Sequence, residues 1–99
     1  MAQAVKKGSS SRDGRTNNKR LQQLSAQAEE RFLKKIGLKI HKNLFDQDKP
    51  VEWLAFRAGV ARSSIREIMA GRSNPRILTL SAIAEALGYR GLVDFLQDL

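Results

Sequence analysis

The sequence predicts an all-helical (all-α) fold, a compact bundle of about five helices, and three observations support this prediction. Apolar residues recur at spacings of three and four along much of the chain, the period of one face of an α-helix. The 99 residues are 41% hydrophobic but only 6% aromatic, a composition that suits a small helical bundle. A chain of this length supports one domain with one modest core. We therefore expect a helical domain over residues 21–99, preceded by a disordered basic arm over residues 1–20.

The expected arm is strongly basic and almost without large apolar side chains. Such a segment cannot bury enough apolar surface to offset the entropy of ordering it, so we expect it to be disordered. Its six cations and one acid give it a net charge of +5. An electrostatic tether to phosphates is the functional interpretation, and an inert extension is the alternative. The cations assigned to the tether are Lys6, Lys7, Arg12, Arg15, Lys19 and Arg20.

The first helix of the domain is expected to begin between Arg20 and Gln27 and to end near Leu44. A polar link follows, and Pro50 suits the start of the next helix. His41 falls on the outer side of this first helix, where we expect it to face solvent. The apolar residues that share one helical phase are Leu21, Leu24, Ala28, Phe32, Leu33, Ile36, Ile40 and Leu44.

The segment from residue 51 to residue 71 reads as two short helices joined by a tight turn. In the first of them, four apolar residues form one stripe at i, i+3, i+4 and i+7. Gly59 follows, and since glycine adopts a left-handed conformation without steric cost, the helix is expected to end there. The stripe consists of Val51, Leu54, Ala55 and Ala58.

The second short helix has one apolar and one polar face. Ile65, Ile68 and Met69 are expected to face inward. Arginine can present two parallel N–H groups to the O6 and N7 atoms of guanine, and serine can donate or accept. We therefore expect the polar face to read base edges in a DNA major groove, the alternative being an ordinary solvated face. Its residues are Arg62, Ser63, Ser64 and Arg66.

The distribution of charge supports a polyanionic partner. Eighteen Lys and Arg against ten Asp and Glu give the chain a net charge of +8 and an isoelectric point near 10.5. Residues 57–76 hold five arginines and one glutamate, a net charge of +4. Positive charge thus gathers in the arm and around the second short helix, which favours nucleic acid. A membrane surface or RNA could exploit the same charge.

The order and spacing of many of these residues resemble the lambda-repressor and Cro-like helix-turn-helix family, also called the XRE type. The resemblance covers about residues 32–88. It implies a helix near Ala61 that enters the major groove, and a preceding helix that lies across the DNA backbone. It also implies base contacts from Arg62 and Ser63, followed by Ser64 and Arg66. The residues that carry it are Leu54, Ala55, Gly59, Val60, Ile65, Ile68, Gly71, Pro75, Leu80, Ile83, Ala84, Ala86, Leu87 and Gly88.

The chain departs from the family pattern in three places. Pro50 and Val51 replace a serine or threonine and a glutamine, and valine cannot make the polar backbone contact that the glutamine makes. Ala61 stands where the second short helix usually has a capping hydroxyl, at a cost of about 1 kcal/mol. Met69 replaces a residue that is often polar.

Turn residues and then two further amphipathic helices are expected after Gly71. The fourth helix places Leu80, Ile83, Ala84 and Leu87 on one face and ends at Gly88. Polar side chains of the turn and its surroundings are suitable donors to DNA phosphates, although an ordinary polar loop is the alternative. The phosphate-binding candidates are Arg57, Arg72, Asn74, Arg76 and Thr79.

Three apolar residues are candidates for a partner or dimer surface. Trp53 lies at a position that is often polar in the resembled family, and packing inside the domain is its alternative. The last helix, within residues 91–99, carries Phe95 and Leu99 on an apolar face. That face either caps the core or pairs with another subunit.

These patterns predict a sequence-specific, double-stranded DNA-binding transcriptional regulator of bacterial or phage type. We expect it in the cytoplasm with the nucleoid, and as a repressor rather than an activator. Its candidate partners are double-stranded DNA, a second copy of the chain in a homodimer, and a partner protein. One alternative is an antitoxin-type module that binds a partner protein and its own promoter. Another is a sequence-neutral nucleoid or RNA-binding protein. With one histidine and no cysteine, we expect no catalysis, no metal and no cofactor, and no apolar run is long enough for a membrane helix.

Overall fold

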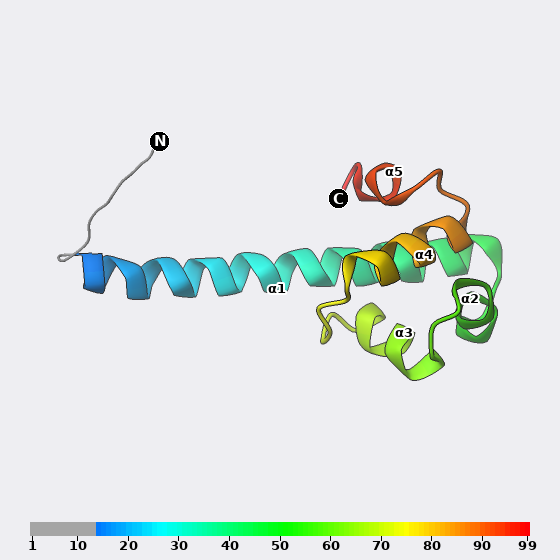
Figure 1. The fold of residues 1–99 in the computed structure, drawn as a ribbon, viewed down its shortest axis with the longest axis horizontal. Helices are drawn as coiled ribbons and strands as arrows, with labels where there is room; N and C mark the ends of the chain where they lie inside the picture. Colours follow the sequence, from blue (N-terminus) through cyan, green and yellow to red (C-terminus); the bar gives the residue numbers. More distant parts are fainter. Residues whose placement is uncertain (1–13) are drawn as a thin grey trace.

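A computed structural model describes the backbone of residues 14–99, and the side chains of Gln23 and of residues 25–99. This part of the chain forms five α-helices and no strand, so the all-helical prediction is confirmed. Four shorter helices gather around the C-terminal half of a long first helix, whose N-terminal half projects from the bundle (Figure 1). The helices are α1 (Gly14–Gln47), α2 (Val51–Ala58), α3 (Arg62–Met69), α4 (Ile77–Leu87) and α5 (Leu92–Leu96).

Helix α1 begins earlier than expected, at Gly14 rather than between Arg20 and Gln27, and it ends at Gln47. No proline occurs between residues 14 and 31, and no glycine follows Gly14 there, so no residue in this stretch breaks a helix. The helix therefore includes residues 14–20, which lie within the segment expected to form the arm. The rest of the expected arm, residues 1–13, lies outside the described residues.

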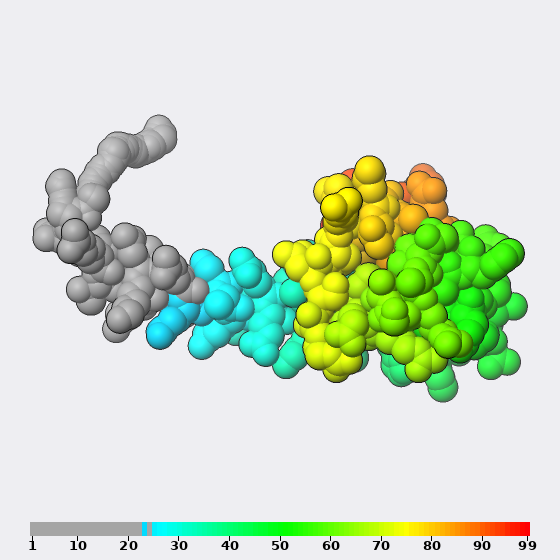
Figure 2. Space-filling view, turned by 60° about the horizontal axis from the view of Figure 1, so that its bottom comes forward, coloured from blue at the N-terminus to red at the C-terminus, as the bar shows by residue number. Residues whose placement is uncertain are grey.

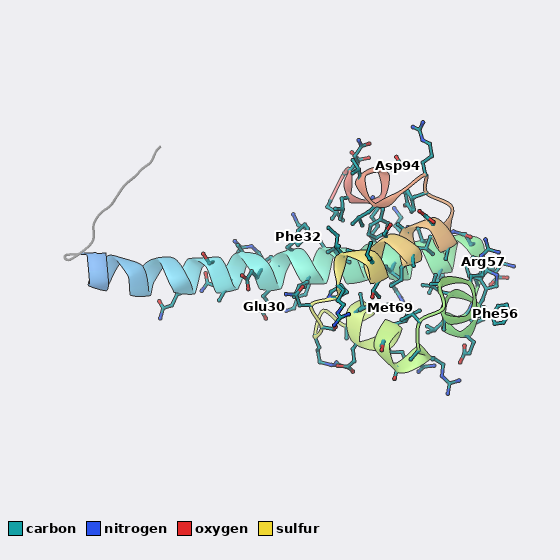
Figure 3. All side chains as sticks on the ribbon, viewed as in Figure 1. Glu30, Phe32, Phe56, Arg57, Met69 and Asp94 are labelled. Atoms are coloured by element: carbon teal, nitrogen blue, oxygen red, sulfur yellow. The ribbon has the colours of Figure 1, made fainter. Side chains whose placement is uncertain are left out.

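The core lies where the C-terminal half of α1 meets the other helices. All five helices contribute buried side chains, and no polar residue is buried among those whose side chains are described. Leu33 is half-buried and Phe32 is 47% exposed, which marks the point where α1 leaves the bundle (Figure 3). The buried residues are Ile36, Ile40, Leu44, Leu54, Ile65, Ile68, Leu80, Ile83, Ala84, Ala86, Leu87 and Phe95.

Two glycines permit the turn after α2 and the close contact between α3 and α1. Gly59 ends α2 with a φ of 69°, the left-handed conformation that its sequence position predicts. Gly37 lies where α1 crosses the end of α3. A Cβ atom there would overlap the carbonyl oxygen of Met69 and come within 2.8 Å of that of Ile68. The missing side chain thus lets α3 seat directly on α1.

The C-terminal helix is fixed to α1 by Lys39. Its ammonium donates to the carbonyl oxygens of Phe95 and Gln97 and lies 5.0 Å and 5.2 Å from the ring centroids of Phe95 and Tyr89. The two rings meet edge to face at 5.2 Å, an attractive arrangement for aromatic pairs. Phe95 is fully buried. Of the two alternatives for this helix, Phe95 fits the one in which it caps the chain's own core and not the one in which it forms a partner surface. Leu99 is half-buried against the same core.

Candidate nucleic-acid interface

The outward side of α3 presents four polar side chains to solvent. Ile65 and Ile68 anchor the helix in the core at 0% and 3% exposure. The opposite side lies open in the space-filling view (Figure 2). Part of it forms a shallow hollow. We call this surface the α3 face, and it consists of Arg62, Ser63, Ser64 and Arg66, all exposed.

The N-terminal end of α3 has no side-chain cap. Ala61 occupies the N-cap position and makes no capping hydrogen bond, as its lack of a hydroxyl predicts. The first backbone N–H groups of a helix have no partner within the helix. They carry partial positive charge and favour a nearby anion. This end of α3 therefore adds to the positive potential of Arg62 and Arg66.

Glu52 of α2 pairs with both arginines of the α3 face. Its carboxylate lies 3.1 Å from a guanidinium nitrogen of Arg62 and 3.4 Å from one of Arg66. A hydrogen bond from its own backbone amide, followed by these two cations, holds the pKa of Glu52 below its usual value. Sequence analysis missed Glu52, because the contact joins two helices and no spacing along the chain reveals it.

The loop between α3 and α4 lies beside the α3 face (Figure 2). Arg72 donates two hydrogen bonds to Glu67, at 3.1 Å and 2.8 Å, which lower the pKa of the Glu67 carboxyl. Asn74 and Arg76 are exposed and Thr79 is half-buried. The structure thus brings four of the five phosphate-binding candidates to the loop and to the start of α4.

Arg57 does not join this group. Its Nε donates to the carbonyl oxygen of Ala86 at 3.4 Å, and its guanidinium lies 5.2 Å from the ring centroid of Trp53. Figure 3 shows Arg57 on the side of α2 nearer the end of α4. Trp53 is half-buried against the core, and Lys49 approaches its ring to 5.5 Å. These contacts fit the packing alternative for Trp53.

Other kinds of site receive no support from the described part of the chain. It contains no cluster of three or more side chains that could hold a metal ion. None of its helices combines the length and the apolar composition needed to cross a bilayer. His41 is exposed, as expected.

Comparison with known protein families gives a match. A family model described as helix-turn-helix matches residues 52–93. This segment runs from the first turn of α2 to the start of α5, and so includes the α3 face and the loop that follows it. No curated protein and no solved structure matches the chain.

Proposed function

We propose that this protein binds specific double-stranded DNA sites and represses transcription there. The match of residues 52–93 to the helix-turn-helix family supports this proposal, as does the resemblance of the sequence to the lambda-repressor and Cro-like type. One observation carries the proposal. The α3 face turns two arginines and two serines outward, while Ile65 and Ile68 on the same helix are buried. Arginine and serine side chains so placed can reach base edges.

The dimensions of α3 suit this role. An α-helix with its side chains is about 10–12 Å across, and the major groove of B-DNA is about 12 Å wide and admits one helix. In the docking common to such motifs, the second helix enters the groove and the first crosses the backbone. Arg62 and Ser63, in the first turn of α3, then lie nearest the bases, with Ser64 and Arg66 next.

Contacts to phosphates would hold α3 in register. In this docking the loop after α3 lies along the DNA backbone, where Arg72, Asn74, Arg76 and Thr79 supply donors. Such contacts position a protein without reading sequence. The cations of residues 1–20 add a further attraction that does not depend on sequence.

Repression and dimer formation complete the proposal. The simplest mechanism is occupancy of a site that RNA polymerase needs. A two-fold dimer would place its two α3 helices about 34 Å apart, one turn of DNA, and so would bind a palindrome.

Selection of bound sites from random duplexes at near-physiological salt tests this proposal. We expect a defined consensus, palindromic if the protein binds as a dimer, whose affinity survives competition with random DNA. An unenriched pool together with measurable binding would contradict specific recognition and favour a sequence-neutral nucleoid or RNA-binding role.

A protein partner is the second candidate function, as in an antitoxin-type module. Its support is the exposure of Phe45 and Phe56, at 80% and 88%, because large exposed apolar side chains are typical of interaction sites. The test compares the proteins that co-purify with the wild-type chain and with the F45S/F56S double variant. A partner that the wild type retains and the variant loses, with DNA selection unchanged, would support this candidate. Identical co-purifying proteins would contradict it.

A further inference from the structure

Two arginines of the α3 face converge on a single carboxylate. Arg62 and Arg66 are four residues apart, so they lie on the same side of α3. Both reach Glu52, at 3.1 Å and 3.4 Å, and the three side chains are between 52% and 59% exposed. The carboxylate comes from the first turn of α2. The contact therefore links the helix expected in the groove to the helix expected across the DNA backbone.

This arrangement reduces the charge of the α3 face without removing its donors. Two guanidinium groups and one carboxylate carry a net charge of +1 instead of +2. Each guanidinium has five N–H groups, and one nitrogen of each approaches the carboxylate. Donors thus remain for a base edge, while the attraction to any nearby phosphate is weaker.

The position of Glu52 adds a second effect. The N-terminal end of a helix attracts anions, and in the proposed docking this end of α2 approaches the DNA backbone. Val51 cannot bind a phosphate there, and Glu52 places a negative charge beside it. Glu52 therefore weakens the attraction of a phosphate to this end of α2, whatever the sequence of the DNA.

We propose that Glu52 is a specificity-determining residue, which weakens binding to arbitrary DNA more than binding to the preferred site. The proposal rests on the proposed function. Binding to arbitrary DNA depends almost entirely on attraction to phosphates, so it bears the full cost of a nearby carboxylate. Before binding, the Glu52 carboxylate holds Arg62 and Arg66 in a fixed orientation. At the preferred site, the two arginines leave Glu52 and donate hydrogen bonds to base acceptors instead.

Glu67 offers a matched control. It is also exposed and paired with an arginine, since Arg72 contacts it at 2.8 Å. Replacing either glutamate by glutamine raises the net charge by one. Only E52Q, however, releases arginines of the α3 face, whereas E67Q releases an arginine assigned to phosphate binding.

The experiment measures fluorescence anisotropy of two labelled duplexes with the full-length wild type, E52Q and E67Q. One duplex is the sequence that the wild type enriches from a random pool, and the other is a random duplex of equal length. Salt is varied between about 50 and 200 mM. Circular dichroism confirms that all three proteins are folded.

We expect E52Q to bind the random duplex about fivefold more tightly, the effect of one unit charge a few ångströms away in water. Its affinity for the selected duplex should change by less than about twofold. The variant removes the repulsion of the phosphates, but it also removes the carboxylate that orients the two arginines, and these two effects oppose each other. The salt slope on random DNA should steepen by up to about 0.9. E67Q should strengthen both complexes alike and keep their ratio.

The outcomes separate this proposal from the function on which it rests. A wild type that prefers no duplex overturns the proposed function, and the role of Glu52 with it. A wild type with a clear preference, together with an E52Q variant of equal or greater preference, overturns the role of Glu52 alone. An equal fall in the preference of E52Q and E67Q for the selected duplex would also overturn it, because the loss of a negative charge at any position would then explain the effect.

Discussion

Arg57 and Arg62 lie on either side of the turn between α2 and α3, yet the fold uses them differently. Arg57 donates to the carbonyl oxygen of Ala86 and lies over the ring of Trp53, so it holds α2 against α4. Arg62 projects into solvent at 59% side-chain exposure and pairs with Glu52. Both arginines add equally to the net charge, but their surroundings give them different roles.

The same contrast separates two surfaces of the molecule. Lys39 and Arg57 each donate to backbone carbonyl oxygens and lie over aromatic rings, contacts that cation–π attraction stabilises. The arginines of the α3 face pair instead with an exposed carboxylate, which an incoming acceptor can replace. A cation that contacts the protein's own carbonyl oxygens and aromatic rings stabilises the packing of the helices. A cation paired with an exposed carboxylate remains available to bind DNA.

Among the variants that test this contrast, Phe95→Ala should have the largest effect. Phe95 is fully buried and packs against Tyr89 and Lys39. Its truncation should lower the free energy of unfolding by about 3–5 kcal/mol, measured by urea denaturation. The control is Val93→Ala on the same helix, where 76% exposure predicts a change within about 0.5 kcal/mol. Equal effects of the two variants would contradict the burial of Phe95.

Arg62→Ala should separate binding from stability. We expect a loss of about 1–3 kcal/mol in binding to the selected duplex, with relaxed preference at one or two base pairs. The thermal midpoint should stay nearly unchanged, because exposed ion pairs contribute little to stability. An equal loss on selected and random duplexes would count against base reading by Arg62.

Arg57→Ala should show the opposite pattern. The loss of one long hydrogen bond and one cation–π contact should reduce the free energy of unfolding by about 1 kcal/mol. Binding to both duplexes should stay within about twofold of the wild type, because the guanidinium is engaged by Ala86 and Trp53. A large loss of affinity without loss of stability would show instead that Arg57 contacts DNA phosphates.

The smallest expected effect concerns pH. Arg72 lowers the pKa of Glu67, so folding favours the ionised carboxylate. The stability from this pair is fully present above the unfolded pKa of about 4.3 and is lost as the pH falls through the lower folded pKa. The wild type should therefore melt slightly above E67Q at pH 7, and this difference should shrink as the pH falls below about 4.3. A difference that persists in acid would show that the ion pair is not its cause.

Local patterns were enough to predict the paired short helices. The stripe beginning at Val51 and the glycine at position 59 set the bounds of α2. The alternation of Ile65 and Ile68 with polar residues set the orientation of α3. These features depend on residues close in sequence and on steric rules that act locally.

Features that depend on distant contacts could not be predicted in this way. The amphipathic stripe around Phe95 is compatible with covering its own core or another subunit, and only the fold selects between them. The hydrogen-bond acceptor of Arg57 and the ion-pair partners of Glu52 belong to other helices, so spacing along the chain does not indicate them. The early start of α1 was missed because the absence of a helix breaker does not itself mark where a helix begins.

The most direct test of the account is to map the DNA-binding surface by NMR. Backbone amide shifts of the full chain would be followed while the selected duplex is added. We predict the largest changes at Arg62, Ser63, Ser64 and Arg66 and over residues 72–79, in the loop and the first turn of α4. Little change is expected at Lys39, Tyr89 and Phe95. Changes centred on α5 and the facing side of α1, with the α3 face unaffected, would contradict the account.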